Sequence, residues 1–186
     1  FSAMDPDIAK LSVASLPGRV ERLVPREHAA DLIEQYRKAL VNRGNAPTPA
    51  DIYIAIQGDK QFRMPNVRLV ELQRGLGSPG FSYVFSWKCV VPDLGACHAL
   101  DVGFVFGSTY SEFHGVGTSV DRLATQMQDA WIAFARTGRP GAASLPEWPA
   151  YDTNSRATMV FDNTCRIDGD PDRDARVLWA TRKLRS

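Results

Sequence analysis

The chain has 186 residues, 44% of them apolar and 23% charged, and its formal net charge is +1. This composition is typical of a globular protein that is long enough to bury a sizeable core. Basic and acidic residues are interspersed, so there is no basic stripe to follow a phosphate backbone, and nucleic acid is not an expected partner.

No apolar run approaches the ~18 residues that a membrane span needs. The opening residues FSAMDPDIAK also lack the basic-then-apolar plan of a signal peptide. We therefore expect no membrane span in this chain. The compartment stays open, because a signal peptide of a longer protein would lie upstream of these residues.

The cysteines exclude two kinds of site. Cys89, Cys97 and Cys165 form no C-x-x-C pair, and an odd number leaves at least one thiol unpaired within the chain. We expect reduced, mostly buried thiols, and neither a metal site nor a disulfide framework.

In the N-terminal half, helical spacing predicts an amphipathic helix over residues 26–41. A second helical region spans about 51–74, where Gly58 and Pro65 should divide it into two helices. Either Thr48 or Asp51 is suited to cap the first of these helices.

A glycine-rich loop and an aromatic strand come next. The sequence GLGSPG at 75–80 fits G-x-G-x-x-G, but a dinucleotide site needs a strand before the glycines and a helix after them, and here the order is reversed. We interpret it as a turn. Over 81–87 large aromatic residues alternate with smaller ones, which predicts a strand with one aromatic face on a core.

The clearest element is a long helix over 119–136, which Gly138 and Pro140 should end. Beyond it, residues 157–162 read as a short strand and 175–182 as a final short helix. Because no internal repeat or low-complexity linker appears, residues 1–186 are interpreted as a single unit.

The three histidines differ in their surroundings. His28 lies in an amphipathic helix among charged residues, which is typical of a solvated surface. His114 precedes two glycines and lies either at a mobile active-site rim or in an ordinary loop. His98 lies in the loop PDLGACHALD after the aromatic strand, which is where α/β-hydrolases usually carry their general base.

Four segments carry a more specific signal. The string CHALDVGFVFG at 97–107 resembles the histidine motif of type-B carboxylesterases and the related cholinesterases. Downstream, MQDAWIAFARTGRP, LPEWPAYD and RATMVFD resemble the helix, proline-rich turn and strand of that family, in the same order.

This resemblance implies an α/β fold, namely the C-terminal part of an α/β-hydrolase with an incomplete sheet flanked by helices. It also implies a serine carboxylic-ester hydrolase in which His98 is the general base of a Ser–Glu/Asp–His triad, with small-molecule esters as substrates and no cofactor. No G-x-S-x-G occurs in the chain. We therefore expect the nucleophile, the oxyanion loop and the catalytic acid upstream, and a chain that is inactive alone.

The resemblance implies further, less specific roles. The family more often has glutamate where Asp101 stands, and Asp101 is interpreted either as a group that supports the histidine loop or as a structural cap. Trp87, Phe104 and Phe106 are candidates for an ester pocket, although aromatic residues near a sheet more often belong to the core.

Two other functions remain alternatives. One is a non-catalytic binding or adhesion protein on the esterase scaffold, and the other is an unrelated small α/β binding module. If the chain is a C-terminal fragment, the aromatic strand and the stripe of Leu123, Met127 and Trp131 would pack on elements encoded upstream. We therefore expect the isolated chain to self-associate.

Overall fold

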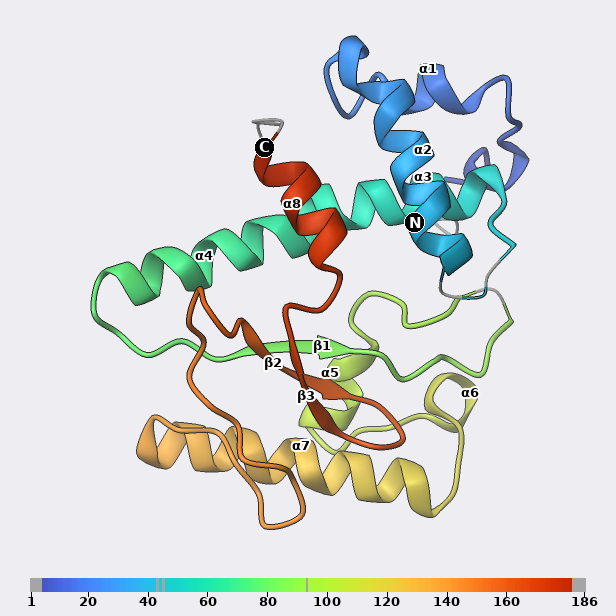
Figure 1. Ribbon diagram of the computed structural model, residues 1–186. Coiled ribbons are helices and arrows are strands. Elements are labelled where there is room, and N and C mark those ends of the chain that lie inside the picture. The colour runs from blue at the N-terminus through green and yellow to red at the C-terminus, as the bar shows by residue number, and fades with distance from the viewer. Residues whose placement is uncertain (1–4, 43, 45, 93, 182–186) are drawn as a thin grey trace. The chain divides into compact units, whose positions relative to one another are not determined.

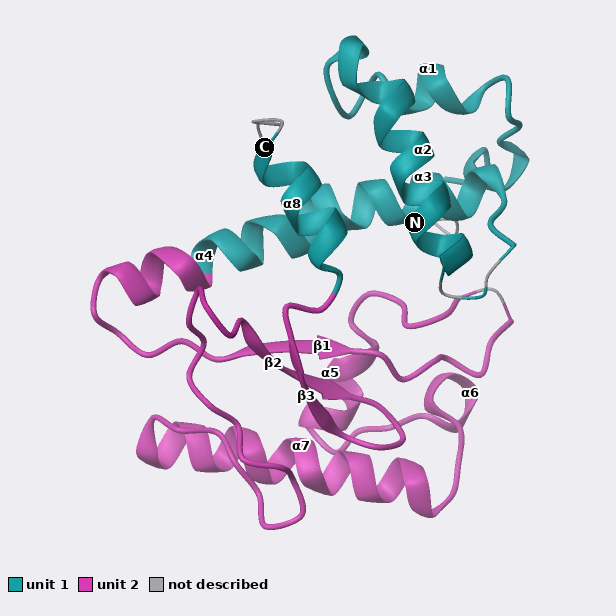
Figure 2. Ribbon diagram, viewed as in Figure 1, with its two compact units in different colours: residues 1–69, 172–186 teal, residues 70–171 magenta. Residues whose placement is uncertain are grey.

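The computed structural model describes residues 5–42, 44, 46–92 and 94–181 (Figure 1). The chain forms two compact units (Figure 2). Unit 1 comprises residues 1–69 and 172–186, and unit 2 comprises residues 70–171. That both belong to one hydrolase domain stays a prediction.

The described residues of unit 1 form helices joined by turns and loops, without a strand. Helix α2 (Arg26–Asn42) and helix α8 (Arg173–Thr181) confirm the helices expected at 26–41 and near the C-terminus. The other elements are η1 (Ile8–Lys10), α1 (Leu16–Val20), α3 (Pro49–Gly58), the π-helical turn η2 (Asp59–Arg63) and the first half of α4 (Met64–Gly75).

The start of α3 uses both residues that were candidates for its cap. The Thr48 hydroxyl accepts from the Asp51 backbone N–H, and the Asp51 carboxylate accepts from the Thr48 backbone N–H at 2.8 Å. This capping box satisfies two N–H groups that the first turn leaves without helical partners. The two expected helices are present as α3 and α4, but Gly58 keeps helical dihedral angles and the join is the π-helical turn η2, with Pro65 in the first turn of α4.

A buried polar contact ties the C-terminal helix to the core of unit 1. The Trp179 indole donates to the Tyr36 hydroxyl at 2.6 Å, and that hydroxyl donates to the Asp59 carboxylate at 2.5 Å. Burial and the adjacent Asp59 carboxylate raise the pKa of Tyr36, so it remains a donor. Tyr36 and Trp179 are both buried, and this chain of bonds joins α2, η2 and α8.

Unit 2 is built on a three-stranded mixed sheet in the order β1-β2-β3 (Figure 1). Strand β1 (Ser82–Phe85) runs parallel to β2 (Ala157–Phe161), with Ser82 opposite Thr158. A parallel pair requires a long crossover, and here the crossover contains α5 (Leu100–Val105), α6 (Ser111–His114) and α7 (Thr118–Thr137). Strand β3 (Arg166–Gly169) returns antiparallel to β2 and was not predicted.

The core of unit 2 lies between the sheet and α7. All five residues of β2 are buried, and α7 buries Leu123 and Met127 within this unit, at 1% and 0% exposure. The expectation that this stripe packs on elements encoded upstream is therefore wrong for these two residues, because the sheet of this chain already covers them. The expected aromatic face is confirmed. The centroid of the Tyr83 ring lies 5.2 Å from that of Trp131 and 5.8 Å from that of Phe161, and both pairs are T-shaped. Gly138 ends α7 in the left-handed conformation, as expected.

Candidate active site

His98 lies in the loop that leaves the carboxyl end of β1, at the turn immediately before α5. Its side chain is exposed, and the next residue, Ala99, has a φ of 65°. This left-handed conformation costs about 1 kcal/mol or more for a residue with a Cβ, so the surrounding structure must hold it in place. In α/β proteins the loops at the carboxyl ends of strands carry functional residues, and His98 occupies such a loop.

Asp101 is in the first turn of α5, where a carboxylate is favoured by the helix dipole. It accepts a hydrogen bond from the Tyr83 hydroxyl at 2.8 Å and provides no cap for the helix, whose N-cap residue is Ala99. Burial, reinforced by Asp101, raises the pKa of Tyr83. The Asp101–Tyr83 hydrogen bond therefore links α5 to β1, the strand that precedes the histidine loop.

The three aromatic candidates for an ester pocket lie in different environments. Phe104 is fully buried in the unit 2 core, with its ring 5.5 Å from that of Phe85. Trp87 is half-buried, packs on Phe104 at 5.6 Å and donates from its indole to the His114 carbonyl. Phe106, at the end of α5, is 77% exposed. A role for any of them in binding an ester stays a prediction.

His114 is the residue near this loop that the sequence did not distinguish. It is only 5% exposed, and both of its ring nitrogens lie within hydrogen-bond distance of backbone atoms. Nδ1 is 2.9 Å from the Tyr110 nitrogen, and Nε2 is 3.1 Å from the Leu100 carbonyl oxygen. In the sequence His114 precedes Gly115 and Gly117 and was interpreted as a residue of an ordinary loop or of a mobile rim, whereas the structure buries it at the end of α6.

Cys89, Cys97 and Cys165 are free, as expected, but only Cys89 is buried. Cys97 and Cys165 are partly exposed, so the expectation of mostly buried thiols is wrong for these two. The Cys89 N–H donates to the Gly95 carbonyl at 2.8 Å, which closes the loop before Cys97. Burial, together with the neighbouring Cys89 thiol, raises the pKa of Cys97, which disfavours the nucleophilic thiolate. Among the residues that the structure describes, no group of three or more His, Cys, Asp or Glu side chains is arranged to hold a metal ion.

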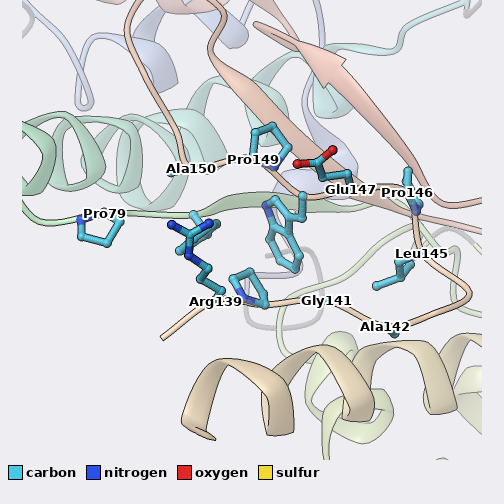
Figure 3. Close-up of a pocket in the computed structure, with 12 residues that line it drawn as sticks. Pro79, Arg139, Gly141, Ala142, Leu145, Pro146, Glu147, Pro149 and Ala150 are labelled. Carbon is cyan, nitrogen blue, oxygen red and sulfur yellow. The ribbon is translucent and has the colours of Figure 1, made fainter. Parts of the chain in front are cut away.

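Unit 2 also contains a hollow of about 300 Å³ under the proline-rich segment that follows α7 (Figure 3). Its walls include Pro79, Arg139, Glu147 and Trp148. The Trp148 indole nitrogen is buried without a hydrogen-bond partner within the described part of the chain. None of the residues that line this hollow belongs to the histidine loop.

The described ranges contain no helix that is both long enough and apolar enough to cross a membrane. A parallel strand pair joined by a helical crossover is typical of α/β folds, and His98 lies exposed in the loop after the first of these strands. The sequence model of the carboxylesterase family matches residues 6–177. The chain belongs to this family.

Individual relatives agree with this assignment. The chain is 29% identical over 161 residues to para-nitrobenzyl esterase of Bacillus subtilis, covering 80% of this chain and 32% of that protein. It is 32% identical over 162 residues to liver carboxylesterase B-1 of Rattus norvegicus, covering 81% of this chain and 26% of that protein. The structure of the Geobacillus stearothermophilus carboxylesterase EST55 matches with a TM-score of 0.78 at 28% identity.

The match to EST55 covers 96% of this chain and 37% of that structure. The chain thus spans between 26% and 37% of the length of these relatives. The expected fold class, part of an α/β-hydrolase with a small mixed sheet flanked by helices, is confirmed.

Proposed function

We propose that this chain is the C-terminal part of a serine carboxylic-ester hydrolase, and that His98 is the general base of its catalytic triad. The observation that carries the proposal is the exposed position of His98 in the loop after β1, within the string CHALDVGFVFG. The substrates are small-molecule carboxylic esters, in keeping with the names of the family's members.

In this reaction the His98 imidazole accepts the proton of a serine hydroxyl as the serine oxygen attacks the ester carbonyl. It then returns the proton to the leaving alcohol, and the same two transfers with water release the acid and regenerate the serine. The 186 residues contain no G-x-S-x-G, and in this proposal the serine, the oxyanion donors and the acid are supplied by a segment outside them.

The neighbours of His98 have supporting roles in this proposal. Asp101 holds the start of α5 through its bond with Tyr83 and so supports the turn in which His98 lies. Phe106 exposes an apolar ring just beyond the same short helix, where it is available to an uncharged part of an ester or to the remainder of the hydrolase domain. The Phe104 and Trp87 rings pack on each other in the core of unit 2.

The chain alone should not hydrolyse p-nitrophenyl acetate faster than free imidazole does at the same concentration, because it has no G-x-S-x-G to present a nucleophilic serine. The complete hydrolase, with the upstream segment joined to this chain, should release p-nitrophenol in a burst and lose activity to a serine-directed organophosphate. Organophosphate-sensitive turnover by the chain alone would contradict the missing-serine argument. A complete protein that binds esters without turnover would favour the non-catalytic alternative.

The isolated chain should self-associate, because unit 2 exposes several large apolar side chains. The most exposed are Leu76 at 83%, Val116 at 81% and Phe106 at 77%. Covering a few hundred Å² of such surface is worth about 5–10 kcal/mol. Light scattering across a dilution series should show a concentration-dependent mass, and the double substitution Phe106→Ser and Val116→Ser should reduce it. A dilution-independent monomer that binds no hydrophobic dye would contradict this prediction.

A further inference from the structure

We infer that His114 is a positioning residue for His98: its imidazole holds the backbone turn from which His98 projects. The inference rests on the proposed role of His98 as general base. Three observations support it, namely the hydrogen bonds of the two ring nitrogens, the close packing around the ring and the backbone conformation at Ala99.

The two hydrogen bonds fix which nitrogen carries the proton. A backbone N–H only donates, so the Tyr110 N–H, 2.9 Å from Nδ1, requires Nδ1 to accept. The proton then resides on Nε2 and is donated to the Leu100 carbonyl oxygen at 3.1 Å. The Tyr110 carbonyl oxygen also lies 3.1 Å from Nδ1, but a proton on Nδ1 would face the Tyr110 N–H at a shorter distance. The Nε2–H tautomer satisfies both neighbours.

Packing leaves the ring little freedom to move. A Cβ added at Gly103 would lie 2.4 Å from Nε2, so the α5 backbone approaches the ring more closely than any side chain at 103 allows. On another side, the Phe104 ring is 5.1 Å away in an edge-on arrangement. The Trp87 indole donates to the His114 carbonyl at 3.2 Å. His114 therefore joins the exit of β1, helix α5 and the start of α6.

These contacts bear on His98 through Leu100, which follows it by two residues. Between them, Ala99 adopts its left-handed conformation, which an unconstrained alanine avoids. The His114 bond to the Leu100 carbonyl, together with the buried Leu100 side chain, fixes the backbone on the far side of Ala99. Releasing that anchor allows the turn to relax and moves the His98 imidazole. A displacement of about 1 Å at a catalytic group is enough to cost about a hundredfold in rate.

A buried histidine that serves stability alone would have the same contacts, so the test must separate the two roles. In the complete hydrolase, the substitutions His114→Gln and His114→Asn test the two hydrogen bonds of the His114 ring separately. The glutamine amide reaches as far as Nε2 and is able to donate to the Leu100 carbonyl. The shorter asparagine amide reaches only the position of Nδ1, where it accepts from Tyr110 and leaves Leu100 without its donor.

Positioning predicts that His114→Asn lowers kcat by about tenfold to a hundredfold with KM nearly unchanged. His114→Gln should recover kcat to at least about tenfold above His114→Asn, even where the two melting temperatures agree. His28→Asn, on α2, is the matched histidine control and should behave as the unsubstituted enzyme. Equal kcat values for the two His114 variants, or losses that follow melting temperature alone, would overturn the inference.

A second measurement needs no catalysis. Imidazole ¹⁵N NMR of the complete hydrolase should place the His114 proton on Nε2, and hydrogen exchange at residues 100–104 should accelerate in His114→Asn more than in His114→Gln. A proton on Nδ1, or equal exchange in both variants, counts against the inference. If His98→Gln leaves the complete hydrolase fully active, the proposed function fails. If His98→Gln abolishes activity and the His114 variants do not differ, only the positioning role fails.

Discussion

Replacing His98 by glutamine in the complete hydrolase should lower kcat by several orders of magnitude, up to about 10⁶-fold. Glutamine retains a similar length and hydrogen-bonding capacity, but its amide cannot accept a proton from the serine. The exposed position of His98 means that the substitution removes no core packing, so the fold should survive it. The measurements are kcat on p-nitrophenyl acetate and the rate of organophosphate labelling of the serine, both of which should fall together.

The matched control for this prediction is His28→Gln, which makes the same change on helix α2 in the other unit. It should leave kcat unchanged, because His28 belongs to no part of the proposed site. Undiminished hydrolysis by His98→Gln with a normal melting temperature would remove His98 from the mechanism and leave the motif around it as a structural feature.

Periodicity predicted the elements whose sequence is long enough to show a repeat. Helices α2 and α7 and the aromatic strand β1 were located to within a few residues. Their apolar positions recur at helical or alternating spacing because one face of each is buried, and burial of that face is what stabilises the element. The glycine-rich turn before β1 was also recognised, because the order of elements around it excluded a dinucleotide site.

Several short elements escaped prediction, and α5 and β3 show the physical reasons. Helix α5 has six residues, among them Gly103 and two valines, so its intrinsic helix propensity is low and no full repeat is visible. Tertiary contacts hold it: the buried Phe104, the Asp101–Tyr83 bond and the His114 ring. Strand β3 spans RIDG, which shows no alternation, and it forms because it pairs with the fully buried β2.

The sequence singled out one of the two histidines at the candidate site and not the other. His98 was singled out because the residues after it form a distinctive string, whereas His114 has no motif and derives its place from contacts across three segments. For Asp101 the sequence left a supporting group and a helix cap as alternatives. Its bond to Tyr83 is a link between strand and helix that depends on the register of both elements, which no local pattern specifies.

Phe104→Ala should lower the free energy of unfolding of this chain by about 3–5 kcal/mol, which is the range for removing a large buried aromatic side chain. Phe104 is fully buried, and its ring contacts those of Phe85, Trp87 and His114. Alanine would leave a cavity among these rings, which the short helix α5 is poorly able to close. Urea unfolding followed by tryptophan fluorescence measures the loss.

Phe106→Ala is the matched control, since the same ring is removed two residues away. Phe106 is 77% exposed, so its loss should change stability by no more than about 0.5 kcal/mol. The two variants together distinguish a core role from a surface role within one motif: Phe104 should govern stability, while Phe106 should affect only self-association of the chain and ester turnover of the complete hydrolase. Equal losses of stability in both variants would show that α5 does not present these two rings to core and solvent in this way.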